Sequence, residues 1–194
     1  LEAAASELLA RSCLVDPAGY ARLDAGVLFS GMEEISLRVL ARTLMCVGGG
    51  DFPPRLKKLE TLHEKMKAAF RDRETSWKGA TLGRCRIMVL QNSAAQRHFL
   101  ICREGRSLPE PTLVQPAMKM DWDNRFRLCL LEQKNVLYQE VMLQPLGATG
   151  WSSLVAQSPN TGKFQIPAAA RISLPALVDN EGILAVPHLN YHRN

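Results

Sequence analysis

The stretch LMCVGGGDFPPRLKKLETL, residues 44–62, decides the fold because it joins two helical patterns. Before it, apolar residues between Ile35 and Met45 recur with helical spacing and predict a helix that runs to about Val47. Three glycines, residues 48–50, can end that helix, because glycine tolerates the left-handed conformation at a helix C-terminus. The stretch therefore predicts a joint between two helices.

The second half of the stretch predicts the start of the next helix. Asp51 can cap it, and Pro53 and Pro54 fit its first turn, where a missing N–H costs nothing. The apolar residues that follow recur at steps of three and four, which predicts one buried stripe: Leu56, Leu59, Leu62, Met66 and Phe70. A phosphate-binding loop is disfavoured, because a Walker sequence needs a Lys followed by Ser or Thr and because Asp51 would repel a phosphate.

The residues before this stretch also favour helices. Residues 3–12 predict a short helix, and Asp16 before Pro17 predicts a helix or turn start. Ser30 and Glu33 have the spacing of a capping box, so we expect a helix to begin there.

After Lys78 the apolar pattern changes to short runs that are typical of strands. Hairpins are expected from residues 81–90 with 97–104, and from 125–131 with 136–144. A non-helical, proline-rich connector is expected over 102–118, a short helix after Gly150, and two strands about an NEG turn within 171–189. The expected fold class is α+β: a helical accessory domain, residues 1–79, and then a β-rich domain of short, mostly antiparallel strands, residues 80–194.

The composition excludes several classes of protein. Hydrophobic residues make up 46% and charged residues 22%, which is ordinary for a globular chain, and no apolar run is long enough to span a membrane. The first residues lack the basic start of a signal peptide, and we expect the chain to be a piece of a longer protein. The five cysteines are odd in number and form no Cys-x-x-Cys, which favours buried thiols in a cytoplasmic protein. The four histidines are scattered and predict no metal site.

Positive charge is concentrated in one segment. Between Arg55 and Arg86 there are ten basic and four acidic residues, although the net charge of the whole chain is only +5. A local excess of this kind is what docking of a polyanion requires. The candidate RNA-contacting residues of this segment are Arg55, Lys57, Lys58, Lys65, Lys67, Arg71, Arg73, Lys78, Arg84 and Arg86. A solvated helix face with local Lys–Glu pairs is the plainer alternative.

Two further groups of residues are weaker candidates. Arg84 and Arg86 alternate in GRCRI, so on a strand both would lie on one face. WDNRF, residues 122–126, offers Arg125 and two aromatic rings that could contact a base. The rings of Trp122 and Phe126 are better explained as core anchors that flank a turn at Asp123 and Asn124.

The order of several motifs resembles a known family. The stretch LRVLARTLMCVGGGDFPPRLKKLETL, then TLGRCRI, ICRE and WDNRF, looks like the region after the catalytic domain of bacterial tRNA(Ile)-lysidine synthetases, also labelled MesJ, and above all of alphaproteobacterial members. The tail resembles the family's closing pattern at Arg171, Leu174-Pro175, Asp179 with Gly182, and Val186-Pro187. The likeness covers nearly all of residues 30–194.

The resemblance implies a ligase as the parent protein. Members of that family use ATP to join lysine to the wobble cytidine of an isoleucine tRNA, with a Ser-Gly-Gly-x-Asp-Ser loop in an N-terminal catalytic domain. No Ser-Gly-Gly occurs here, so the ATP and Mg²⁺ sites and the catalytic residues are expected in that missing domain. This chain alone is expected to be non-catalytic, with tRNA and the missing domain as its partners.

Two hypotheses from different classes follow. The first is a tRNA-positioning accessory region. The second is a protein-interaction or homodimerisation module, in which the apolar stripe of residues 56–70 packs on another subunit and the basic residues only maintain solubility.

Overall fold

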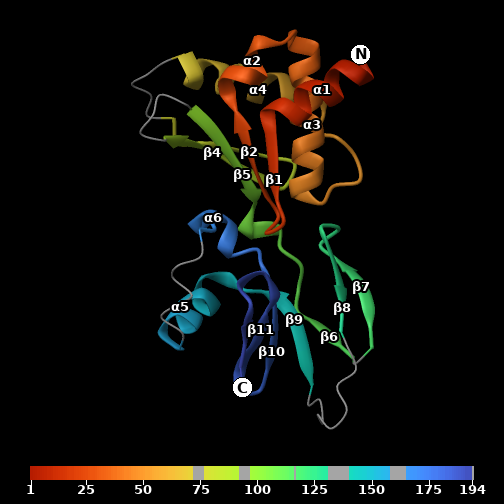
Figure 1. Cartoon of the computed structure of the whole chain (residues 1–194), viewed down its shortest axis with the longest axis vertical. Coiled ribbons are helices and arrows are strands. Elements are labelled where there is room, and N and C mark those ends of the chain that lie inside the picture. The colour runs from red at the N-terminus through yellow and green to blue at the C-terminus, as the bar shows by residue number, and fades with distance from the viewer. Residues whose placement is uncertain (72–76, 92–96, 116, 131–139, 158–164, 194) are drawn as a thin grey trace. The chain divides into compact units, whose positions relative to one another are not determined.

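The computed structural model describes residues 1–71, 77–91, 97–115, 117–130, 140–157 and 165–193. It contains helices and antiparallel sheets, so the α+β class is confirmed. The chain forms two compact units (Figure 1). Unit 1 comprises residues 1–16 and 20–104, and unit 2 comprises residues 17–19 and 105–194.

In its described residues, unit 1 combines four helices with a five-stranded sheet. Its elements are α1 (Glu2–Ser12), β1 (Cys13–Asp16), β2 (Tyr20–Asp24), α2 (Ala25–Ser30), α3 (Glu33–Gly48), α4 (Leu56–Arg71), β3 (Ala80–Leu82), β4 (Cys85–Gln91) and β5 (Arg97–Arg103). The strand order is β1-β2-β5-β4-β3, and every pair is antiparallel.

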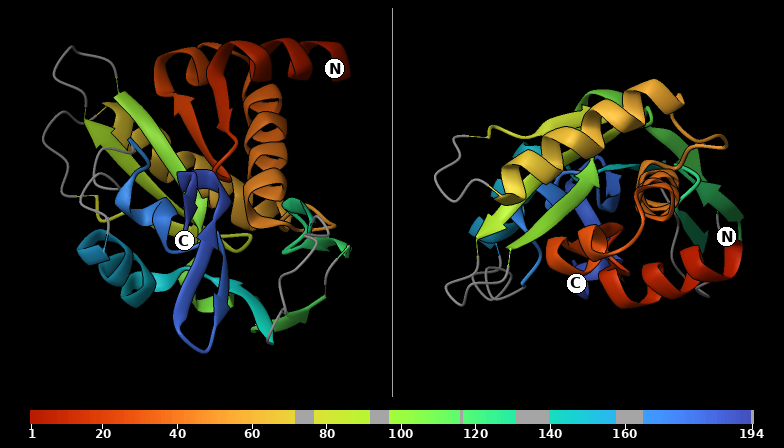
Figure 2. Two further views of the ribbon diagram at one scale, coloured as in Figure 1. Left: turned by 60° about the horizontal axis from the view of Figure 1, so that its bottom comes forward. Right: turned by 90° about the horizontal axis from the view of Figure 1, so that it is seen from above.

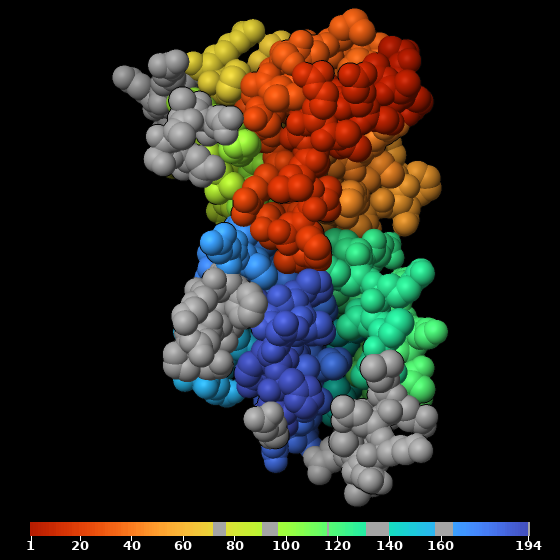
Figure 3. All heavy atoms as spheres, viewed as in Figure 1, coloured from red at the N-terminus to blue at the C-terminus, as the bar shows by residue number. Residues whose placement is uncertain are grey.

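One face of this sheet is apolar and packs against the helices (Figure 2). Ala21 and Ile87 both pair with Ile101, and these three side chains enter the same core as Leu40 of α3 and Met66 of α4. Burial of such side chains is the main stabilising contribution to a domain of this size. Residues of α1 to α3, red to orange, form a continuous face of unit 1 in the space-filling view (Figure 3).

The boundary between the units differs from the one that the sequence predicted at residue 79. The hairpin of β4 and β5 does not begin a separate β-rich domain, because β5 pairs with β2 near the N-terminus. The hairpin of β1 and β2, which the sequence analysis did not foresee, supplies that partner. The first unit is therefore mixed, and it extends to Glu104.

Unit 2 contains a second five-stranded sheet and a separate hairpin. Its elements are η1 (Gly105–Ser107), β6 (Thr112–Val114), β7 (Lys119–Trp122), β8 (Phe126–Cys129), β9 (Val141–Pro145), α5 (Gly147–Gln157), α6 (Ala168–Arg171), β10 (Pro175–Asp179), β11 (Gly182–Val186), η3 (Pro187–Leu189) and β12 (Tyr191–His192). The sheet order is β12-β11-β10-β9-β6, and β7 pairs with β8.

Several local predictions hold in unit 2, and one pairing is wrong. The strands about the NEG turn are β10 and β11, and α5 matches the expected short helix. Residues 125–131 were expected to pair with 136–144, but β8 pairs with the preceding β7, whereas β9 pairs with β6 and β10. The connector contains a single-turn helix and the short strand β6.

All five cysteines are free thiols, as the spacing predicted. Cys46 and Cys129 are exposed, however, so the expected burial is wrong for these two. Within the described ranges, none of the helices is long and apolar enough to cross a bilayer.

Candidate nucleic-acid interface

The glycine-rich joint has two separate structural roles. Gly49 caps α3 in the left-handed conformation, with φ of 63°, as the sequence predicted. Gly48 has another role, because a Cβ atom at this position would lie 2.1 Å from the carbonyl oxygen of Gly83. The absence of a side chain thus allows the end of α3 to pack directly on the turn between β3 and β4.

The start of α4 differs from the prediction. The helix begins at Leu56, after both prolines, and the first backbone bonds run from Lys58 and Leu59 to the carbonyl of Arg55. Asp51 lies in a bend and does not cap it. The capping box before α3 is also not formed, because the Ser30 hydroxyl donates back to the carbonyl of Val27.

The apolar stripe of α4 packs inside unit 1. Leu59, Leu62 and Met66 are buried in the core together with the sheet, whereas Leu56 is exposed. The dimerisation hypothesis needed this stripe as the contact to another subunit. Because the stripe is already covered within the chain, that mechanism is wrong.

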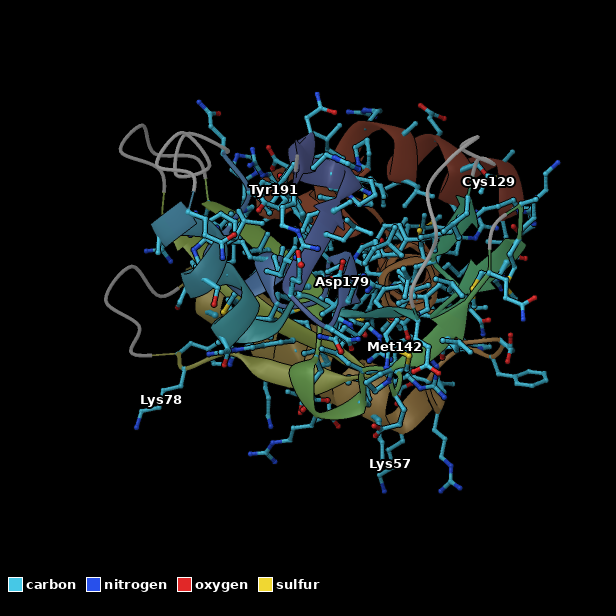
Figure 4. All side chains as sticks on the ribbon, turned by 90° about the horizontal axis from the view of Figure 1, so that it is seen from below. Lys57, Lys78, Cys129, Met142, Asp179 and Tyr191 are labelled. Atoms are coloured by element: carbon cyan, nitrogen blue, oxygen red, sulfur yellow. The ribbon has the colours of Figure 1, made fainter. Side chains whose placement is uncertain are left out.

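The predicted basic residues of this region are mostly exposed. Among the residues that the structure describes, the exposed candidates are Arg55, Lys57, Lys58, Lys65, Arg71, Lys78, Arg84 and Arg86. Figure 4 shows Lys57 and Lys78 extending away from the ribbon. Arg73 lies outside the described residues. The side chains of the exposed set make no ion pair with any carboxylate of the described part of the chain.

The opposite situation holds on α1 and α3, where arginines are paired. Arg38 contacts Glu2 at 3.4 Å and Glu34 at 3.0 Å, and Arg42 also pairs with Glu2. Arg11 lies 3.9 Å from Glu7. Exposed pairs of this kind contribute little to stability, but they neutralise the field of that face. Several of the exposed cations that have no carboxylate partner within the described ranges lie on α4 and at the adjoining β3–β4 turn.

The lysines of α4 lie together on one flank of the helix. At about 100° per residue, Lys58 and Lys65 fall within about 20° of each other along one edge of the buried stripe, and Lys57 lies about 80–100° farther round toward solvent. By the same count Glu60 and Glu64 lie on the far side of Lys57 from Lys58 and Lys65, and Glu64 is within about 20° of Lys57. The helix has 16 residues and is therefore about 24 Å long, so these lysines can contact successive phosphates.

Lys67 differs from the other candidates because its charge is compensated. Its side chain is only 25% exposed, and its Nζ lies 3.7 Å from Glu33 and 4.0 Å from Glu64. We therefore leave Lys67 out of the contact surface.

The same two carboxylates lie beside a buried histidine, which the sequence did not predict. Ligand atoms of His63, Glu33 and Glu64 lie within 4.8 Å of one another, as a metal site would require. The ammonium group of Lys67 already compensates both acids, so the geometry favours an ion-pair cluster. The His63 side chain is 2% exposed, and among the described residues neither ring nitrogen has a hydrogen-bond partner. Burial lowers the pKa of His63, and the charges of Glu33 and Glu64 oppose that shift.

The structure brings three of the candidate cations to one cavity. Arg55, Lys58 and Arg84 line a cavity of about 540 Å³ between the joint, the first turn of α4 and the turn between β3 and β4. Asp51 is the acidic residue in the lining. The N-terminal end of a helix adds to the positive potential there.

Arg84 and Arg86 do not share a face, contrary to the prediction. Gly83 and Arg84 form the turn between β3 and β4, with φ of 58° and 61°. Arg86 lies on β4 between Cys85 and Ile87, which both enter the core under the helices. Because strand residues alternate, Arg86 lies on the sheet face opposite to α4.

Arg125 is held inside unit 2 and is not a surface contact. Its guanidinium pairs with Asp123 at 2.7 Å, and the two side chains are only 2% and 4% exposed. It also donates to the carbonyls of Gly19 at 3.1 Å and Ser173 at 3.0 Å. Arg125 therefore stabilises the β7–β8 turn.

The aromatic residues of this hairpin have the expected structural role. Trp122 is buried and stacks on Phe126 with 6.0 Å between ring centroids. Asp123 and Asn124 form the turn between them, with φ of 55° and 52°.

Two site-shaping residues had no clear signal in the sequence. Phe52 lines the same cavity as Arg55, Lys58 and Arg84 and is 84% exposed. Arg97 donates to the carbonyls of Ala69 at 2.8 Å and Phe70 at 3.2 Å, so it caps the C-terminus of α4 from a distant strand. The exposed phenyl ring in a glycine- and proline-rich segment could have been noted, but the contact of Arg97 depends on tertiary structure.

Known proteins similar to this chain share one description. The chain is 27% identical over 174 residues to a tRNA(Ile)-lysidine synthase of Ruegeria pomeroyi, and 26% identical over 177 residues to one of Wolbachia sp. subsp. Brugia malayi. A tRNA(Ile)-lysidine synthase of Rickettsia bellii is 24% identical over 196 residues. These matches cover 90–96% of the chain.

The resemblance to tRNA(Ile)-lysidine synthases is confirmed. The chain spans 34–41% of the length of these synthases. No protein-family model and no solved structure matches the chain.

Proposed function

We propose that this chain is the tRNA-positioning part of a tRNA(Ile)-lysidine synthetase. The full-length protein would ligate lysine to the wobble cytidine of an isoleucine tRNA, and a catalytic domain outside this chain would bind ATP and Mg²⁺. This chain would hold the tRNA body, so that the anticodon reaches the distant active site. The similarity to synthases over 90–96% of the chain supports the family role.

The unpaired cations of unit 1 carry the proposal. Lys57, Lys58 and Lys65 are exposed on one flank of a rigid helix, and no described carboxylate compensates them. Long cations spread over a surface suit the phosphate backbone of RNA, where affinity comes from released counterions. Because α4 is fixed by its buried stripe and by Arg97, the lysines are presented at constant spacing.

A gel-shift titration with isoleucine tRNA tests the proposal. The chain should bind, and a complex with about five phosphate contacts should lose on the order of a hundred-fold or more in affinity between 50 and 200 mM salt. A triple variant with Lys57→Glu, Lys58→Glu and Lys65→Glu should bind more weakly with an unchanged circular dichroism spectrum.

A matched control separates local contacts from net charge. Arg11→Glu, Arg106→Glu and Lys119→Glu change the net charge by the same amount at exposed positions outside α4. This control should keep most of the affinity. Equal losses in both triple variants would mean that overall charge, and not the flank of α4, governs binding, and an absence of binding at low salt would reject the proposed function.

A further inference from the structure

The cavity beside the joint has the chemical features of a nucleotide site. Its volume of about 540 Å³ lies in the range of small-ligand pockets. Met45 and Leu82 supply apolar surface, and Phe52 supplies an aromatic ring that is 84% exposed. A single concave surface thus offers both apolar contact and stacking.

The charge of the lining selects an anion. Arg55, Lys58 and Arg84 carry three positive charges against the single carboxylate of Asp51. None of these three cations pairs with an acidic side chain within the described ranges. Arg84 is held at the tip of a tight turn, and Arg55 and Lys58 belong to the start of α4, so the three charges come from rigid elements.

The combination of a ring and cations distinguishes an unpaired nucleotide from a duplex. Bases inside a helix are already stacked and cannot lie on a protein ring, whereas bases in loops and ends stack on aromatic side chains. A flat basic surface is enough for a duplex, and the lysine flank of α4 provides it. The exposed Phe52 and the hollow beside it would have no use in that contact.

We propose that this cavity binds one unpaired nucleotide of the tRNA, with the base on Phe52 and its phosphate on Arg55, Lys58 and Arg84. The inference rests on the proposed function, because it assigns a second, base-contacting part to the same RNA-binding surface. A nucleotide site in this cavity would make the chain selective for RNA that has a single-stranded segment. The cations of α4 alone would not give this selectivity.

The test compares two RNAs in binding to the full chain. One is a stem-loop with 2-aminopurine at an unpaired position, and the other is a blunt duplex of equal phosphate count. Phe52→Ala should weaken binding of the stem-loop by about 5- to 150-fold, which corresponds to the 1–3 kcal/mol of one base–aromatic stack. The same variant should leave duplex affinity unchanged, and it should abolish the quenching of 2-aminopurine fluorescence.

Two controls separate stacking from general damage. Phe52→Tyr keeps the ring and should retain both stem-loop affinity and quenching. Arg84→Gln should weaken the binding of the stem-loop more than that of the duplex. Because Phe52 is exposed, the melting temperature of its variants should be that of the wild type.

The outcomes distinguish the two proposals. If Phe52→Ala leaves stem-loop binding unchanged while the triple α4 variant weakens it, the nucleotide site is wrong and the proposed function stands. If neither variant changes RNA binding, both the nucleotide site and the proposed function are wrong. If Phe52→Ala instead dissociates a dimer seen in light scattering and has no effect on RNA, a second copy of the chain occupies the cavity and the inference is overturned.

Discussion

Replacing Gly48 by alanine tests the close contact between α3 and the β3–β4 turn. An added Cβ would lie 2.1 Å from the carbonyl oxygen of Gly83 and 3.2 Å from the sulfur of Cys85. The first distance is far below van der Waals contact, and the atom opposite is backbone, which cannot rotate away. The helix or the turn must therefore move by about an ångström or more, relative to a normal contact of about 3.5 Å.

The expected cost combines two opposing effects. Overpacking of a rigid core typically costs about 1–3 kcal/mol, and a backbone clash belongs at the upper end of that range. The higher helix propensity of alanine returns about 1 kcal/mol. The net loss is thus about 2 kcal/mol, which lowers the melting temperature of a domain of about 100 residues by about 8–16 °C.

Thermal unfolding followed by circular dichroism measures this effect, with Gly26→Ala as the control. Gly26 also lies in a helix of unit 1, but a Cβ there would meet only Asp24 Oδ1 at 3.4 Å and the ring of Phe70 at 3.9 Å. The control should melt at the wild-type temperature or slightly above it. A Gly48→Ala variant that melts as high as this control would refute the direct packing of α3 on the turn.

Three other substitutions have distinct expected results. Arg125→Met should lower the free energy of unfolding by about 3–5 kcal/mol in urea titrations, because it removes the guanidinium that pairs with the buried Asp123 carboxylate; a loss below 1 kcal/mol would contradict the buried pair. His63→Leu should remove part of the pH dependence of the free energy of unfolding. Because the pKa of His63 is lowered in the folded chain, the unfolded chain binds a proton first as pH falls below about 6.5. The wild type should therefore lose more stability than the variant between pH 7 and pH 5. Equal losses would show that His63 is not the titrating group. Arg97→Met should cost about 1.5–3 kcal/mol and increase amide exchange in the last turn of α4, and unchanged exchange there would argue against the cap.

Patterns within single elements were largely predictable from the sequence. The spacing of Leu59, Leu62 and Met66 identified the buried stripe of α4, and Gly49 marked the end of α3. The turn at Gly83 and Arg84 was missed, because an apolar run on both sides resembled one continuous strand. Its glycine was the available signal, since a left-handed turn favours glycine at one of its two positions.

Pairing between distant segments could not be predicted in the same way. The contact of β2 with β5 joins residues 74 to 80 positions apart, and no local pattern encodes it, so the unit boundary was placed too early. The site shows the same limit. Sequence identified the cations, but only the folded chain shows that Lys67 is neutralised, that Arg125 is buried, and that Arg84 joins Arg55 and Lys58 at one cavity.

The salt dependence of tRNA binding, measured by fluorescence anisotropy for the wild type and the triple Lys57, Lys58 and Lys65 variant, tests the central claim most directly. Loss of three phosphate contacts should reduce the slope of log affinity against log salt by about 2 to 3. The affinity ratio between the two proteins should therefore shrink by about 20- to 40-fold from 50 to 200 mM salt. Parallel lines with the wild-type slope would show that this flank of α4 makes no phosphate contact.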